Sequence, residues 1–300
     1  MKKFFSVILI ILLFAGCTPQ GEGNLEEDRD IKIVTSFAPV YAITLALTEG
    51  TSGFDVSCMT GSSTGCLHDY SLTTADMRML EAADLFIISG GGMEEHFLEK
   101  IKESYPQLEI LDASQNTILL TDAHDETNPH IWLSSVNATH MAKNIAEKLC
   151  NLALHNAQIV SGDIIFNKNL SNFASELAKI KEKYLHEFDS PVNNKIITFH
   201  EAFSYLGEEF GLDVTAVVET HPGVAPDPRT LSDLVTKIKN EKIAAVFTEP
   251  QYPSGTVDVL KDETNIKIAE LDPIVTGEMD KDSFVTRFEK NLKTLCETLT

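Results

Sequence analysis

Short apolar runs alternate with helical segments along the chain from residue 31 onward. In the first half, four such runs are predicted to be buried strands: Ile31–Thr35, Phe54–Cys58, Leu85–Ser89 and Leu108–Asp112. Helical stretches lie between them, such as Pro39–Thr48, which has proline at a position that a helix tolerates. This alternation predicts βα units and a mostly parallel sheet.

The second half repeats this pattern. Its predicted strands are Lys195–Phe199, Val214–Val218, Ile243–Thr248 and Ile266–Leu271. Its predicted helices lie near Glu201–Phe210, Leu231–Asn240 and Asp282–Leu299. The chain is therefore predicted to be an α/β protein of two lobes, each a mostly parallel sheet flanked by helices.

A long amphipathic segment lies between the two halves. Its apolar positions recur at steps of three and four residues: Phe166, Leu170, Phe173, Leu177, Ile180 and Tyr184. Residues 156–188 contain no proline and one glycine, so one helix could run roughly 45 Å at 1.5 Å per residue. We expect a single rigid backbone helix that joins the lobes and limits hinge motion. The alternative is an ordinary core helix, which typically has about 8–20 residues.

The N-terminus predicts export. Lys2 and Lys3 precede an apolar run from Phe4 to Ala15, which is too short to span a bilayer but fits a secretory signal peptide. The run ends in Leu-Phe-Ala-Gly-Cys17, which resembles the bacterial lipobox, although the pattern usually has an aliphatic residue where this chain has phenylalanine. Cys17 is therefore predicted to be lipidated and to hold the protein on the extracytoplasmic face of the cell membrane. An ordinary cleaved signal with an incidental Cys17 is the alternative.

The stretch after Cys17 is polar and acidic up to Asp30 and predicts a flexible tether. The predicted organisation is a signal peptide (1–16), a tether (17–30), an N-terminal lobe (31–154), the backbone helix (155–188) and a C-terminal lobe (189–300). A formal net charge of −21 argues against nucleic acid as a partner. Acidic surface attracts cations only diffusely and does not by itself predict a metal site.

Three of the nine histidines lie where ligands bind in α/β proteins. His68, His130 and His200 are at or near the carboxyl ends of predicted strands, the edge at which open α/β sheets hold their ligands. Asp272 directly follows the predicted strand Ile266–Leu271. Three imidazoles and one carboxylate, two from each half, can form a tetrahedral zinc site. Spacing alone does not select these four residues.

Several motifs occur in a fixed order around these residues. They are His68-Asp69-Tyr70 with Thr74-Ala75-Asp76, Gly90-Gly91-Gly92-Met93-Glu94, Asn128-Pro129-His130-Ile131-Trp132, Phe199-His200-Glu201-Ala202-Phe203, Thr248-Glu249-Pro250-Gln251 and Leu271-Asp272-Pro273. Over essentially the whole mature length, the chain resembles the zinc- and manganese-specific solute-binding lipoproteins of ATP-driven importers.

The resemblance implies a function and a ligand set. In that family the metal lies between the lobes on residues matching His68, His130, His200 and Asp272, and a long helix joins the lobes. The implied partners are a membrane permease of the ABC type and its cytoplasmic ATPase, with the receptor itself a monomer. Manganese members usually have glutamate at the position of His200, and imidazole-rich sites favour zinc. Zn²⁺ is the expected ion, and Mn²⁺ or iron on the same fold is the alternative.

The loop before His68 departs from the family pattern, because Cys58 and Cys66 lie where relatives usually have glycine and proline. Export to an oxidising compartment favours a Cys58–Cys66 disulfide, and a thiolate ligand replacing an imidazole is the alternative. The pairing of Cys150 and Cys296 is left open.

The second departure concerns the segment before His130. Zinc receptors often carry a long histidine-rich loop there, whereas residues 122–126 of this chain contain a single histidine, His124. A solvated acidic loop is expected, and a weak auxiliary metal site is the alternative.

Three other classes of protein were weighed against a receptor. A secreted zinc hydrolase needs an open coordination position and a general base; Glu201 beside His200 could serve as the base, but no His-Glu-x-x-His helix is present. A surface adhesin would bind metal only incidentally. A receptor for haem or an iron chelate would need a wide aromatic or arginine-lined cleft, and this chain has few arginines. The sequence therefore predicts a metal receptor that is not an enzyme.

Overall fold

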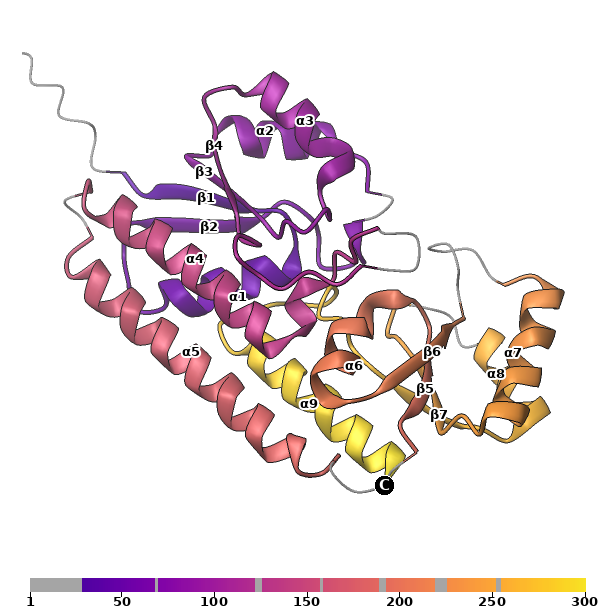
Figure 1. Ribbon diagram of the computed structural model, residues 1–300. Coiled ribbons are helices and arrows are strands. Elements are labelled where there is room, and N and C mark those ends of the chain that lie inside the picture. Colours follow the sequence, from indigo (N-terminus) through magenta and orange to yellow (C-terminus); the bar gives the residue numbers. More distant parts are fainter. Residues whose placement is uncertain are drawn as a thin grey trace, which may run out of the picture.

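Two parallel four-stranded sheets form the centres of two lobes (Figure 1). The computed structural model describes residues 29–67, 70–121, 126–156, 159–188, 193–218, 226–251 and 255–300. The N-terminal lobe contains β1 (Ile31–Thr35), α1 (Ala38–Thr48), β2 (Phe54–Cys58), α2 (Thr74–Glu81), β3 (Leu85–Ile88), α3 (Glu95–Ser104), β4 (Glu109–Asp112), η2 (Ile131–Leu133) and α4 (Ser135–Ala153). After α5 (Gly162–Leu185), the C-terminal lobe contains β5 (Lys195–Thr198), η3 (Glu201–Phe203), α6 (Ser204–Phe210), β6 (Asp213–Val217), α7 (Pro228–Glu241), β7 (Ala245–Thr248), α8 (Gly255–Thr264), β8 (Lys267–Glu270) and α9 (Ser283–Leu299).

The two sheets share one topology, with strand orders β2-β1-β3-β4 and β6-β5-β7-β8. All eight predicted strands are present; β1 and β2 match the prediction at both ends, and the ends of the other six differ from it by at most two residues. β3 is buried along its whole length, as expected for a parallel strand covered by helices on both faces. In each sheet the first strand lies between the next two in sequence: β2 and β3 flank β1, and β6 and β7 flank β5. The strand order therefore switches sides between β1 and β3 and between β5 and β7. Ligands bind at such switch points, beyond the carboxyl ends of the strands.

In the N-terminal lobe this switch point is filled by a buried carboxylate. Glu94 accepts hydrogen bonds from the Ser36 hydroxyl at 2.7 Å and from the backbone N–H groups of Ser89 and Gly90 at 2.9 and 3.0 Å. Burial raises the pKa of Glu94 to about 7, although these donors oppose the rise. Gly90 has φ 77°, and a Cβ there would lie 1.8 Å from Asp112 Oδ1, so the glycine is needed to close this end of the sheet.

Helix α5 is the predicted backbone helix. It packs against α1 and α4 of the N-terminal lobe and against α9 of the C-terminal lobe (Figure 1). The predicted apolar stripe is buried except for Leu170, which is half-buried, and Phe173 meets Phe284 of α9 with ring centroids 5.5 Å apart. Twenty-four residues give a length of about 36 Å, shorter than predicted. The helix starts after Ser161, whose left-handed φ of 56° separates it from α4. The lobe boundaries at residues 154 and 188 stay predictions.

A buried tryptophan and a bridging carboxylate help to hold the lobes together. The Trp132 ring, fully buried and packed edge-on against Phe37, donates from Nε1 to the Pro273 carbonyl oxygen at 2.8 Å. The Glu209 carboxylate of α6 accepts from the Ser135 N–H of the N-terminal lobe at 2.7 Å and pairs with Lys181 of α5 at 2.9 Å. The buried tryptophan anchor and the bridging carboxylate favour a fixed relative orientation of the lobes.

Among the described residues, no helix combines the length and apolar character needed to cross a membrane.

Candidate metal site

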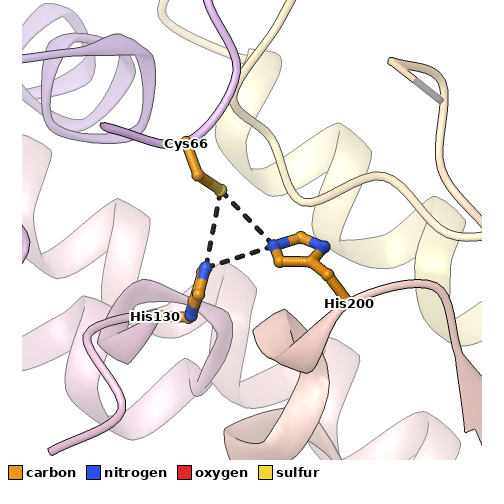
Figure 2. Close-up of side chains that lie close together, drawn as sticks. All are labelled: Cys66, His130 and His200. Carbon is orange, nitrogen blue, oxygen red and sulfur yellow. Dashed lines mark hydrogen bonds between the residues drawn. The ribbon is translucent and has the colours of Figure 1, made fainter. Parts of the chain in front are cut away.

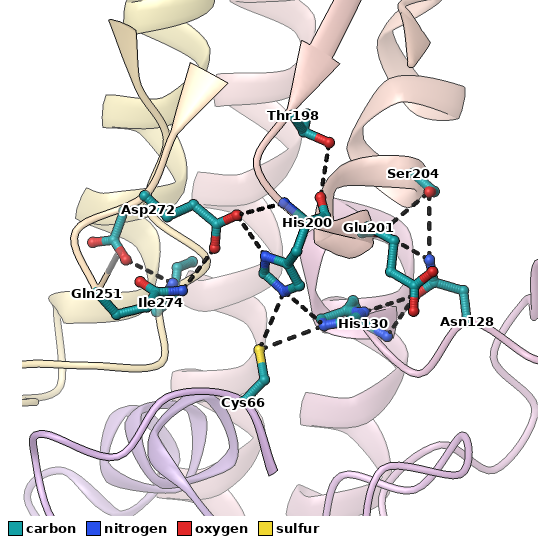
Figure 3. A network of polar contacts seen from close by, with 11 residues as sticks. Cys66, Asn128, His130, Thr198, His200, Glu201, Ser204, Gln251, Asp272 and Ile274 are labelled. Carbon is teal, nitrogen blue, oxygen red and sulfur yellow. Dashed lines mark hydrogen bonds and ion pairs between the residues drawn. The ribbon is translucent and has the colours of Figure 1, made fainter. Parts of the chain in front are cut away.

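The C-terminal lobe places His200 directly beyond β5. Its ring is buried, with 4% of the residue exposed. Glu249, which follows the neighbouring strand β7, accepts from the His200 backbone N–H at 3.3 Å, and its Oε1 lies 2.5 Å from Nδ1 of the ring. The Thr198 hydroxyl donates to the His200 carbonyl oxygen at 2.7 Å (Figure 3). These contacts fix the ring with Nε2 directed away from the sheet.

The N-terminal lobe supplies His130, which is completely buried at the start of η2. Asn128 Oδ1 lies 3.0 Å from the His130 backbone nitrogen and 2.9 Å from its Nδ1. The Asn128 amide nitrogen donates to the Glu201 carbonyl oxygen at 2.9 Å, so Oδ1 is the acceptor and His130 Nδ1 carries the hydrogen (Figure 3). The Tyr205 hydroxyl also donates to the Asn128 carbonyl oxygen at 2.7 Å. His130 is therefore oriented partly by the opposite lobe.

The two imidazoles and a cysteine form a compact triangle between the lobes (Figure 2). The two Nε2 atoms lie 3.2 Å apart, and Cys66 Sγ lies 3.4 Å from Nε2 of His130 and 3.5 Å from Nε2 of His200. Because both Nδ1 atoms face oxygen atoms, the Nε2 atoms are the ones available to a shared cation. This triangle combines two histidine nitrogens with one cysteine sulfur, all of them ligand atoms suited to a transition metal.

Electrostatics favour positive charge at this point. Burial lowers the pKa of His200, but its contacts with Cys66 and the Glu249 carboxylate outweigh burial and raise the pKa to about 10. Burial raises the pKa of the Cys66 thiol. Without metal, His200 therefore holds a proton that an incoming cation must displace.

The structure brings together only part of the predicted ligand set. His130 and His200 meet, and His68 lies outside the described residues. Asp272 is not part of the cluster. Its Oδ1 accepts from the Ile274 N–H at 2.7 Å, and its Oδ2 lies 3.4 Å from Arg287 Nη1. Ile274 has a left-handed φ of 65°, a rare conformation for a β-branched residue, and this turn fixes the present direction of the Asp272 carboxylate.

The predicted Cys58–Cys66 disulfide does not form, because the structure has both residues as free cysteines. Cys58 ends β2 with its sulfur 3.6 Å from Thr60 Oγ1, whereas Cys66 directs its sulfur at the histidine pair. The loop between them turns Cys66 into the space between the lobes. Cys150 and Cys296 are also free cysteines. The predictions for Cys17 and His124 fall outside the described residues.

Sequence reasoning missed two residues that orient the ligands. Asn128 and Glu249 each belong to a motif of the resemblance, but neither was assigned a role. Glu249 follows a strand that is a neighbour of β5 in space but not in sequence, so the sheet order was needed to pair it with His200.

Two parallel α/β lobes joined by one long helix, with buried metal-ligand atoms where the lobes meet, define a two-lobed solute-binding protein. The family described as zinc-uptake complex component A, periplasmic (ZnuA), matches residues 33–298. The chain belongs to this family, as the resemblance predicted.

Relatives and solved structures agree with this assignment. The chain is 28% identical to the high-affinity zinc uptake system protein ZnuA of Yersinia pestis over 284 residues, covering 84% of this chain and 86% of the relative. It is 25% identical to the zinc-binding lipoprotein AdcA of Streptococcus pneumoniae, covering 99% of this chain but only 61% of that relative. The Mn²⁺ complex of FpvC from Pseudomonas aeruginosa superimposes with a TM-score of 0.79 at 24% identity, covering 90% of this chain and 98% of FpvC. Zn(II)-bound AdcA from Streptococcus pneumoniae superimposes with a TM-score of 0.76 at 25% identity, covering 90% of this chain and 58% of AdcA.

Proposed function

We propose that the protein is the extracytoplasmic receptor of an ABC importer, which captures zinc between its lobes and delivers it to a membrane permease. The observation that carries the proposal is the convergence of His130 and His200 Nε2 at 3.2 Å, one from each side of the interface between the lobes. The zinc names of the Yersinia and Streptococcus relatives support zinc as the cargo. Capture requires no bond-breaking chemistry, so we propose that the receptor is not an enzyme. Because a single chain supplies ligands from both lobes, we also propose that it acts as a monomer.

The proposed ligands are His130 and His200, with His68 and Asp272 retained from the sequence. For Asp272 to bind the ion, its carboxylate must rotate, which would give up the 2.7 Å hydrogen bond from the Ile274 N–H and the longer 3.4 Å contact with Arg287. Imidazole donors favour zinc over manganese by ligand type and by the general affinity order of divalent metals. The Mn²⁺ complex of FpvC, which shares the fold, supports manganese as the alternative cargo.

Elemental analysis tests this proposal directly. The protein purified without added metal is expected to carry zinc at about one ion per chain, as a single closed site requires. Stoichiometric manganese or iron in place of zinc would contradict zinc as the cargo. A metal-loaded protein that hydrolyses ester or peptide substrates would contradict a receptor without catalysis.

The affinity for zinc is expected to rise with pH beyond the neutral range. His200 has its pKa raised to about 10, so below that pH each zinc ion must displace a proton from it. Displacement of the His200 proton alone should therefore strengthen binding by about one log unit per pH unit, and any thiol that binds zinc as a thiolate adds to this slope. A histidine with an ordinary pKa near 6.5 would contribute no slope of its own above about pH 7.5. Chelator competition titrations from about pH 6 to 9 measure the slope, and a flat profile above neutrality would refute the raised pKa as a factor in binding.

We also propose that Cys17 is lipidated and anchors the receptor to the membrane. Its position at the end of the apolar signal supports this assignment, and the lipoprotein name of AdcA agrees with it. Cys17→Ser is expected to abolish labelling by fatty acid and to release the protein from the membrane fraction, whereas the control Cys58→Ser should keep both. Unchanged labelling of Cys17→Ser would exclude this anchor.

A further inference from the structure

The triangle formed by Cys66, His130 and His200 has the dimensions of a zinc site with one sulfur ligand. Tetrahedral zinc has bonds of about 2.0–2.1 Å to nitrogen and about 2.3 Å to sulfur, which places two nitrogens about 3.3 Å apart and nitrogen and sulfur about 3.6 Å apart. The structure has 3.2 Å between the two Nε2 atoms and 3.4 and 3.5 Å from Sγ to each of them. Zinc could therefore bind all three atoms with shifts of about 0.2 Å or less, within the tolerance of a real site.

The loop that carries Cys66 is held from both sides. The adjacent Leu67 is fully buried in the core, and its carbonyl oxygen accepts from the Tyr70 N–H at 2.9 Å. Earlier in the loop, the Ser62 carbonyl oxygen accepts from the N–H of Gly277 in the C-terminal lobe at 2.6 Å. Cys66 is thus anchored to both lobes, as a ligand between them requires.

The sulfur of Cys66 does not form the disulfide with Cys58 that the sequence predicted. Cys66 is a free cysteine, and its sulfur contacts the two Nε2 atoms rather than Cys58. The histidines direct these nitrogens inward because Asn128 and Glu249 lie against their Nδ1 atoms. Two inward-facing imidazole nitrogens and a thiol at these distances are arranged as three ligands around one point.

We propose that Cys66 binds zinc directly through its sulfur and is the residue that most strongly excludes manganese. This inference rests on the proposed zinc-receptor function and deepens it. When the Sγ–Zn bond forms, the S–H proton passes to solvent, and the thiolate offsets one of the two positive charges of the ion. Thiolate is a soft ligand that suits zinc, whereas manganese prefers oxygen. With Cys66, His130 and His200 bound, one position of a four-coordinate site is left, so only one of the two other proposed ligands, His68 and Asp272, can complete it.

A purely structural role for Cys66 makes a different prediction. If its S–H only donated a hydrogen bond to an imidazole, serine would replace it well, because a hydroxyl is a donor too. If sulfur binds the metal, serine substitutes a hard oxygen for a soft ligand. Cys66→Ser therefore separates the two roles, and Cys58→Ser is the matched control at the other end of the same loop.

X-ray absorption at the zinc edge reports the ligands directly. The zinc-loaded wild type and Cys58→Ser are expected to show a sulfur shell at about 2.3 Å beside nitrogen and oxygen at about 2.0–2.1 Å. Cys66→Ser is expected to keep zinc but lose the sulfur shell. A wild-type spectrum with nitrogen and oxygen ligands alone would overturn the proposal while leaving the zinc-receptor function standing, because the ion would still be bound.

Competition titrations with zinc and manganese test the effect on selectivity. Loss of a partner outside the ligand shell already costs about 10–100-fold in metal affinity, so Cys66→Ser should lower zinc affinity at least tenfold. The zinc-to-manganese affinity ratio should fall with it, while Cys58→Ser leaves the ratio unchanged. An unchanged ratio in a folded Cys66→Ser protein would overturn the assignment of selectivity to Cys66. Failure of the wild type to bind zinc at all would instead reject the proposed function.

Discussion

Replacing His130 by alanine is expected to weaken zinc binding by about two to three orders of magnitude. Zinc sites in small domains contribute about 10–16 kcal/mol in total, so one of four ligands carries about 3–4 kcal/mol, which corresponds to about 10²–10³ in Kd. His130 is the better of the two histidines to change. The His200→Ala variant would leave the buried Glu249 carboxylate without its imidazole partner, which would destabilise the fold itself.

The matched control is His155→Ala, because His155 is an exposed histidine outside the cluster. Both variants are measured by competition with a zinc chelator of known affinity, and circular dichroism verifies that each is folded. Equal zinc affinity of His130→Ala and wild type would remove His130 from the ligand set.

Zinc is expected to stabilise the fold strongly, because ligands from both lobes meet only in the folded chain. With free zinc at about 1,000 times Kd, binding to the folded state alone adds about 4 kcal/mol to the free energy of unfolding. For a chain of this size, that gain should raise Tm by roughly 8 °C. Differential scanning calorimetry with zinc and with excess chelator measures the shift.

His130→Ala serves as the control in this experiment as well, since it should lose most of the shift. A Tm indifferent to zinc and to chelator at neutral pH would count against a site between the lobes. An equal shift in wild type and in His130→Ala would place the stabilising ion elsewhere, for example on the acidic surface.

The strands and the joining helix were predictable because their signals are local. The run Leu85–Ser89 is apolar throughout, as β3 requires when helices cover both faces of the sheet. The stripe from Phe166 to Tyr184 has the helical period, and all of it but the half-buried Leu170 is buried as predicted. The length of α5 was overestimated because the left-handed Ser161 leaves no clear mark in the sequence.

The ligand positions were predictable only in part. His130 and His200 were found because they lie at strand ends and match family motifs, and both reach the interface between the lobes. The direction of Cys66 was not predictable, since no periodicity fixes the side chains of an irregular loop. The Cys58–Cys66 disulfide was predicted only from the oxidising environment of an exported protein, and the structure does not have it. The turn that holds Asp272 depends on the rare backbone conformation of Ile274, which sequence pattern does not reveal.

The central claim is that one zinc ion binds between the lobes on His130 and His200. The most direct test is an anomalous difference map, recorded at the zinc edge from crystals of zinc-loaded protein. The account predicts a single strong peak at about 2.0–2.1 Å from Nε2 of both histidines. A peak on the acidic surface, with none between these two nitrogens, would contradict it.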